Sequence, residues 1–467
     1  MTVRSCPLSR REFGAALCSL PAASLFGAQE RAQLPWNQPA SVARVYVASP
    51  TVHWPKPDLD VERDRADVEA RMSEVARKHG QDVRFVGGEL LRQDSEVEGW
   101  LKKHSQADAI LIFPMTAPAG PLNALVNAAP APMLYFHRPY AGHSWSSVGG
   151  WQQAGKRIAI VASSTLDDLD PYIPIFRAIQ YLRNSKVLVV AASPKGRQEQ
   201  ADAFTKQFGT QMKFFTYDDL KAVFESADAR KAEKEAEALK RAALKVVEPK
   251  PQEITDAMRF YLGVVSWLER ERANAITLDC FPGLLAKKLP AYPCIAWSKL
   301  NDAGYYGVCE GDIQSTMTQM LITPYSGMPG FVTDPVFDTS RNEVIHAHCV
   351  SATRMKGIHG PSSPFILRNH LETAEGAVMQ VLVPANETIT CARFVGAKKF
   401  LVSTGEVTGN VDSDRGCRTQ FRTRVADAQK MLENYSSGLH RVIFYGDHVR
   451  AAERMGKMLG FQVVREG

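Results

Sequence analysis

The chain has 467 residues, which is long enough for two or three domains with large cores. Hydrophobic residues make up 45% and charged residues 23% of it, as in ordinary soluble globular proteins, and a net charge of +6 is modest for this length. Because the basic residues are not interleaved with aromatic ones, the composition gives no support for a nucleic-acid-binding protein.

The amino terminus has the pattern of an export signal. Arg10 and Arg11 are followed by a moderately apolar run over residues 13–28, which is the pattern of a twin-arginine signal. The run is short and contains Pro21, so we expect no stable membrane span. We predict a signal peptide over residues 1–28, a linker over 29–42, and export to the periplasm or the extracellular space. An uncleaved signal that anchors the protein stays an alternative, because Phe26 is a poor residue before a cut after Ala28.

Apolar runs and amphipathic segments alternate from residue 44 onward. We expect buried strands at residues 45–48, 83–86, 109–113 and 133–136, and helices at 61–79, 96–104 and 122–128. This alternation predicts a doubly wound parallel sheet in a domain over residues 43–153. Ligands bind beyond the carboxyl ends of such strands, so His137 and Arg138 are candidates for substrate binding.

A second α/β domain is predicted over residues 154–326, and the pattern changes after it. Strands at 158–161, 187–190, 213–215 and 275–278 alternate with helices at 171–183, 226–245 and 253–270. Beyond residue 327, short apolar runs separated by turns indicate antiparallel strands. We therefore predict a fold of class α/β: two doubly wound parallel-sheet domains, then a β-rich, barrel-like domain over 327–467 that ends in a strand–helix–strand unit.

The residues best suited to chemistry lie between positions 301 and 349. Glu310 stands at a loop-to-helix junction; Gly311 allows the backbone to approach something closely, and Asp312 is expected to cap the helix that begins at residue 313. Asp334 follows in a Gly/Pro-rich connection, and His348 closes a short apolar run. Two carboxylates on loops, with imidazoles nearby in sequence, suit a hard divalent cation that works with acid and base groups.

The order of several short segments in the last two fifths of the chain resembles the L-fucose isomerase and L-arabinose isomerase superfamily. The segments are ITLDC (276–280), PCIAWS (293–298), ND (301–302), CEGD (309–312), HC (348–349) and HRVIFYG (440–446). The resemblance implies a metal-dependent aldose–ketose isomerase that acts through an enediolate. It implies manganese held by Glu310, Asp334 and His440, with Glu310 and Asp334 as the catalytic acid and base.

The resemblance also implies a small sugar as substrate and a homo-oligomer, a trimer or a hexamer. His348, Trp297 and Asn301 join His137 and Arg138 as candidates for substrate binding. For His348 and Trp297, a place in the core is the alternative.

Two ligand positions have rivals in the sequence. Asp338 is an alternative to Asp334, and His448 is an alternative to His440, because the segment 446–448 carries an extra residue relative to the family pattern.

Two other classes of protein stay open. The export signal is compatible with an exported carbohydrate-binding protein that has the same scaffold but does not catalyse a reaction. A metal-dependent hydrolase is the other class, but the sequence contains neither an HExxH nor a GxSxG signature.

Overall fold

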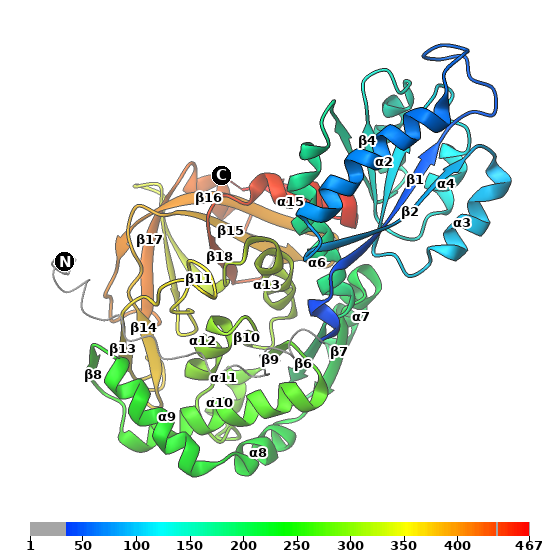
Figure 1. Ribbon diagram of the computed structural model, residues 1–467. Helices are drawn as coiled ribbons and strands as arrows, with labels where there is room; N and C mark the ends of the chain where they lie inside the picture. Colours follow the sequence, from blue (N-terminus) through cyan, green and yellow to red (C-terminus); the bar gives the residue numbers. More distant parts are fainter. Residues whose placement is uncertain (1–33, 436–437, 467) are drawn as a thin grey trace. The chain divides into compact units, whose positions relative to one another are not determined.

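The computed structural model describes residues 34–435 and 438–466 (Figure 1). These residues form two compact units, which we describe separately. The first unit comprises residues 35–183 and 450–462, and the second comprises the rest of the described chain. The expected signal peptide, residues 1–28, lies outside the described residues.

The first unit is built on a parallel sheet with strand order β2-β1-β3-β4-β5. Its strands are β1 (Ala40–Val47), β2 (Val83–Leu91), β3 (Ala109–Pro114), β4 (Met133–His137) and β5 (Ile158–Ala162). Every residue of β3 is buried, as expected for a strand covered on both faces. The accompanying helices are α2 (Val61–Lys78), α3 (Val97–Lys103), α4 (Leu122–Ala128), α5 (Val148–Gln153), α6 (Ile173–Arg183) and α15 (Val449–Leu459), with 3₁₀ turns η1 (Pro35–Asn37), η2 (Asp94–Glu96), η3 (Ser144–Ser147) and η4 (Leu166–Tyr172).

The second unit begins with a smaller parallel sheet of order β10-β9-β6-β7. Its strands are β6 (Lys186–Val190), β7 (Gln211–Phe215), β9 (Ala275–Leu278) and β10 (Tyr306–Cys309). The long helix α10 packs against both α8 and α9, as Figure 1 also shows. The helices are α7 (Gln198–Phe208), α8 (Tyr217–Ser226), α9 (Ala229–Ala242), α10 (Pro251–Glu271), α11 (Cys280–Leu285), α12 (Cys294–Asp302) and α13 (Ile313–Ser326).

The carboxyl-terminal part of the second unit is a closed antiparallel barrel of six strands in the order β15-β18-β11-β12-β17-β16, closed by pairing of β15 with β16. The strands are β11 (Phe331–Asp338), β12 (Glu343–His348), β15 (Thr388–Val395), β16 (Lys399–Asn410), β17 (Thr419–Val425) and β18 (Arg441–Tyr445). The strand β19 (Gln462–Arg465) lies beside β16, and α14 (Ala428–Glu433) follows β17. A small sheet contains β8 (Lys245–Val246), β13 (Phe365–Arg368) and β14 (Val378–Val381).

The predicted fold class is confirmed: two parallel sheets precede a closed barrel. One local expectation differs. The strand expected at 158–161 pairs with β4 and completes the first sheet rather than opening the second. The local pattern identifies an apolar segment, but its neighbours in space decide its role.

The helix α13 connects the parallel sheet of the second unit to the barrel. It packs against β9 and β10 on one side and against β15 and β18 on the other. Eight consecutive residues of its interior, 315–322, are buried, as expected for a helix enclosed between two layers. The amino-terminal end of α13 therefore lies where the sheet and the barrel meet, and the candidate site lies at this end.

Candidate metal centre

Five acidic and imidazole side chains of the second unit are delivered from five places in the chain. Glu310 directly follows β10, and Asp312 caps α13. Asp334 lies in β11, His348 ends β12, and His440 directly precedes β18. They converge because α13 fixes the carboxyl edge of the sheet against the barrel strands.

The backbone at Glu310 has an unusual conformation. Glu310 and Gly311 both lie in the left-handed region, with φ of 64° and 61°. For a residue with a side chain this conformation costs about 1–2 kcal/mol. A Cβ atom at position 311 would lie 2.7 Å from Nε of Arg197, so a side chain there would require Arg197 to shift. The surrounding fold therefore holds Glu310 in a strained position, as is common at functional sites.

Asp312 is the buried centre of a polar network around the start of α13. Its carboxylate accepts hydrogen bonds from the backbone and hydroxyl of Ser315, at 3.0 and 2.8 Å. The same carboxylate contacts Nη1 of Arg393 at 2.7 Å and Nδ1 of His440 at 2.8 Å. Burial alone would raise the pKa of Asp312, but His440 and Arg393 outweigh it and hold that pKa well below its usual range. Asp312 is thus a helix cap, as expected, and in addition it orients His440.

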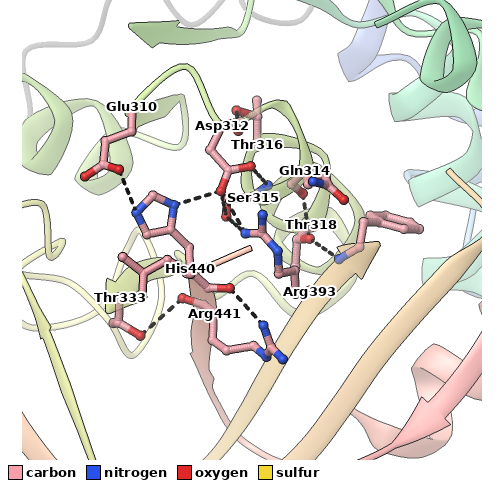
Figure 2. Close-up of polar contacts among 12 residues, drawn as sticks. Glu310, Asp312, Gln314, Ser315, Thr316, Thr318, Thr333, Arg393, His440 and Arg441 are labelled. Carbon is pink, nitrogen blue, oxygen red and sulfur yellow. Dashed lines mark hydrogen bonds and ion pairs between the residues drawn. The ribbon is translucent and has the colours of Figure 1, made fainter. Parts of the chain in front are cut away.

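His440 lies between carboxylates (Figure 2). Since Nδ1 is bound to Asp312, Nε2 faces Glu310 and Asp334, with a carboxylate oxygen of each at 3.4 Å. Burial would lower the pKa of His440, but Asp312 and Glu310 raise it to about 10. The pKa of Glu310 in turn is held well below its usual range by His348 and His440.

His348 approaches the same carboxylate from β12. Its Nε2 lies 3.8 Å from Oε1 of Glu310, and its ring centroid lies 5.6 Å from that of His440. Its Nδ1 accepts a hydrogen bond of 2.8 Å from the backbone N–H of Cys349. Both histidines are almost fully buried, so their rings are fixed by packing as well as by these bonds.

The group has the composition of a site for a divalent cation. One ligand atom each from Glu310, His348 and His440 lie within 4.8 Å of one another. Three buried atoms here have no hydrogen-bond partner: Oδ1 of Asp334 and Nε2 of both histidines. Leaving such atoms unsatisfied costs about 1–3 kcal/mol each, and a cation bound to Oδ1 of Asp334 and Nε2 of His440 would remove that cost for these two atoms. The residues therefore fit a metal ion.

The carboxyl edge of the parallel sheet carries a further ion pair beside Glu310. Arg197 and Asp279 follow the neighbouring strands β6 and β9, and their side chains are 3.0 Å apart. From β6 the chain continues to β7 on one side, and from β9 to β10 on the other. Ligands bind at such points of divergence in open parallel sheets. The acidic and imidazole cluster therefore stands where the topology of the sheet also favours a ligand.

The other residues singled out in the sequence have different surroundings. Trp297 is fully buried against Phe260, and both amide atoms of Asn301 bond to the backbone of Gly307, so both lie in the packing beneath β10. His137 and Arg138 belong to the first unit, where the guanidinium of Arg138 forms two hydrogen bonds with the carboxylate of Asp64.

The two rival ligands are engaged elsewhere. Nε2 of His448 lies 2.7 Å from the carbonyl of Tyr445, and Asp338 contacts Ser340 and Arg341 at the end of β11. Neither belongs to the group of Glu310, His348 and His440, and Asp334 is also outside that group, although its Oδ1 lies 3.4 Å from Nε2 of His440. The geometry thus favours His440 and Asp334 over their rivals.

Sequence reasoning missed Arg393 and the contact between Asp312 and His440. Arg393 is the one charged residue of strand β15, and its side chain is only 4% exposed. A single arginine within a buried strand is a recognisable signal, because a buried charge requires a partner. The sequence does not say which of many carboxylates is that partner.

The fold and the cluster together define a mixed α/β protein with a closed barrel and an acidic and imidazole group able to hold a metal ion. No family model matches the chain. The chain is 28% identical, over 131 residues, to the sulfoquinovose isomerase of Clostridium sp. (strain MSTE9). The match covers 27% of this chain, and the chain spans only 27% of the length of that relative. The similarity supports a sugar-isomerase kind of function.

None of the helices in the described part of the chain combines the length and the apolar composition needed to cross a bilayer.

Proposed function

We propose that this protein is a metal-dependent aldose–ketose isomerase. The observation that carries the proposal is the arrangement around Nε2 of His440, a buried nitrogen with no hydrogen-bond partner and with oxygens of Glu310 and Asp334 each 3.4 Å away. Two carboxylates and one imidazole directed at one point suit a hard or borderline divalent cation. The similarity to a sugar isomerase supports the same reaction class.

Glu310, Asp334 and His440 would hold the cation, and manganese is our choice because two of the three ligands are carboxylates. When bound, the cation supplies positive charge beside the carbonyl and hydroxyl oxygens of the sugar. The raised pKa of His440 means that Nε2 would give up its proton to bind a cation, while Asp312 would keep the other proton on Nδ1, so Nε2 would present a lone pair to the cation. Elemental analysis of protein purified without chelator tests the metal, and less than about a tenth of an equivalent of any divalent metal would contradict it.

The carboxylates also provide the base that the reaction needs. Isomerisation removes a proton from C2 of the aldose, and the electron pair of that C–H bond forms the C1–C2 double bond while O1 takes up a proton. Return of a proton to C1 with loss of the O2 proton then gives the ketose. The low pKa of Glu310 keeps it ionised at neutral pH, which is the state required of a base. We assign removal of the proton from carbon to Glu310. We assign proton transfer on the opposite side of the sugar to Asp334.

The experiment that tests the function is proton exchange in deuterated water. The protein is incubated with manganese and a panel of aldoses, including sulfoquinovose because the relative is named for it. An isomerase incorporates deuterium at C1 or C2 and forms the ketose. Binding without exchange would instead identify a carbohydrate-binding protein, and release of a cleaved product would identify a hydrolase.

Substituting Glu310 connects the activity to the site. Glu310→Gln keeps the shape but removes both the charge and the basicity, so we expect exchange to fall by about 10²–10⁴-fold or more. Asp338→Asn is the matched control, since this carboxylate contacts Arg341 outside the cluster. A folded Glu310→Gln variant with most of its activity would contradict the assignment.

Export and assembly remain proposals that rest on the sequence. The twin-arginine pattern of Arg10 and Arg11 supports transport of a folded, metal-loaded protein to the periplasm or beyond. The resemblance to the fucose-isomerase family supports a trimer or hexamer. Fractionation of cells and light scattering of the purified protein test the two proposals separately.

A further inference from the structure

The two histidines of the centre have opposite hydrogen-bonding arrangements. Nδ1 of His440 faces a carboxylate oxygen of Asp312, which can only accept a hydrogen bond from it. Nδ1 of His348 faces the backbone N–H of Cys349, which can only donate. Both rings then present Nε2 to Glu310, at 3.4 Å for His440 and 3.8 Å for His348.

These arrangements select different tautomers. Neutral imidazole carries its proton on one nitrogen and a lone pair on the other. In His440, once the ring is neutral, the proton is on Nδ1, so Nε2 has the lone pair that a metal ligand requires. In His348 the lone pair is on Nδ1, so Nε2 carries the proton. A cation could bind at Nε2 of His348 only if that proton were lost or the bond from Cys349 were broken.

Nε2 of His348 is also a buried donor without an acceptor. It makes no hydrogen bond within the described chain, and the side chain is only 7% exposed. Leaving a buried donor unpaired costs about 1–3 kcal/mol, so a partner is expected from outside the described residues. The nearest ionic group is Glu310, the residue assigned to proton removal, so a substrate oxygen bound there comes within reach of this donor.

We infer that His348 is a hydrogen-bond donor to the substrate rather than a metal ligand. Its Nε2–H points at the sugar oxygen on which negative charge develops when the adjacent carbon loses its proton. A neutral imidazole is an effective electrophile in enzymatic enolisation of this kind. The inference deepens the proposed isomerase function and rests on it, and it reduces the metal ligands to Glu310, Asp334 and His440.

The test compares two amide variants of His348, each of which places its amide near a different ring nitrogen. His348→Gln places an amide N–H near the former Nε2 and keeps a donor. His348→Asn places its amide near the former Nδ1, where it can still accept from Cys349, but it has no donor at the Nε2 position. We expect kcat to fall about 10²–10³-fold in His348→Asn, the usual loss for one such donor, and to recover in large part in His348→Gln.

Manganese affinity distinguishes a donor from a ligand. Titration calorimetry should give both His348 variants an affinity within about threefold of the unmodified protein, whereas His440→Asn should lose at least about 100-fold. Pulsed electron paramagnetic resonance of the manganese-loaded protein should show one coupled histidine nitrogen, lost in His440→Asn and kept in His348→Asn. Two coupled nitrogens, or equal losses of affinity at the two positions, would overturn the inference.

The tautomers can be measured without any substitution or activity. Nitrogen-15 shifts of the histidine rings, recorded on the folded protein without metal above pH 10, where His440 is neutral, and with magnesium at neutral pH, should place the proton of His348 on Nε2 and that of His440 on Nδ1. A proton on Nδ1 of His348 would contradict the inference even if the variants fail to fold. If instead the tautomers are as expected but no metal binds, the proposed function fails and the hydrogen-bonding assignment stands.

Discussion

His346 and His348 are two residues apart on β12, and alternation sends both side chains to the same face of the strand. Both are almost fully buried, at 1% and 5% exposure. His346 lies between the hydroxyls of Thr333 and Thr423, at 3.3 and 2.9 Å, and burial lowers its pKa to about 3. His348 reaches the end of the barrel, where it faces Glu310 and its Nε2 has no hydrogen-bond partner.

The comparison shows that burial alone does not identify a functional histidine. The neutral ring of His346 has hydroxyl partners on both nitrogens, so it is a satisfied part of the barrel interior. The ring of His348 is also buried, but among the described residues its Nε2 has no hydrogen-bond partner. The difference lies in the partners supplied by neighbouring strands.

The largest effect is expected from breaking the centre itself. His440→Ala removes the ligand nitrogen, so we expect manganese affinity to fall by at least about 100-fold. This loss exceeds the usual effect of substituting a residue that only contacts a metal ligand. Titration calorimetry measures this, with His448→Ala as control, because His448 bonds to Tyr445 instead. Unchanged affinity in His440→Ala would remove this histidine from the centre.

A smaller loss is expected when the support of His440 is weakened. Asp312→Asn keeps a residue that caps helices well but removes the charge that orients the ring, so we expect metal affinity to fall by about 10–100-fold. Asp427→Asn is the control, because Asp427 caps α14 in the same way without contacting a histidine. Equal behaviour of the two variants would reduce Asp312 to a helix cap.

The pH dependence of stability tests the role of His346, the histidine of β12 that lies in the barrel interior. The pKa of His346 is about 3 in the folded protein and near 6.5 in the unfolded chain, so the unfolded state binds more protons at acid pH. Its contribution to stability is therefore complete above pH 6.5 and is lost towards pH 3, by up to about 1.4 kcal/mol per pH unit. Urea unfolding at several pH values should show this slope reduced in His346→Gln. If the difference in unfolding free energy between the unmodified protein and His346→Gln did not vary with pH, this role of His346 would be contradicted.

The smallest effect is expected at the backbone beside Glu310. Gly311→Ala and Gly327→Ala both place a side chain at positive φ, 61° and 70°, but only position 311 would bring a Cβ against Arg197. We expect both variants to lose about 1 kcal/mol of unfolding free energy, and Gly311→Ala to lose a further 1 kcal/mol or so together with metal affinity. Thermal unfolding and metal titration measure the two losses. If Gly311→Ala lost no more stability or metal affinity than Gly327→Ala, Arg197 would have to move aside.

Much of the fold follows from local patterns. Continuous apolar runs and helical periodicity predicted most of the parallel strands, because these patterns depend on residues close in sequence. The pairing of strands does not: β5 joins β4, and β15 closes the barrel by pairing with both β16 and β18. Such choices depend on which surfaces meet, which a periodicity cannot specify.

For the site, the sequence by itself determined which residue types are available and where the chain turns. Glu310 stands out at a loop-to-helix junction with Gly311 beside it, and a family resemblance was needed to connect it with Asp334 and His440. Only the tertiary structure joined His440 to Asp312, 128 residues away, and placed Arg393 behind them. It also gave His348 a backbone donor and His440 a carboxylate. A histidine has the same ring wherever it occurs, and only the hydrogen-bond partner provided by the fold decides which nitrogen keeps its proton.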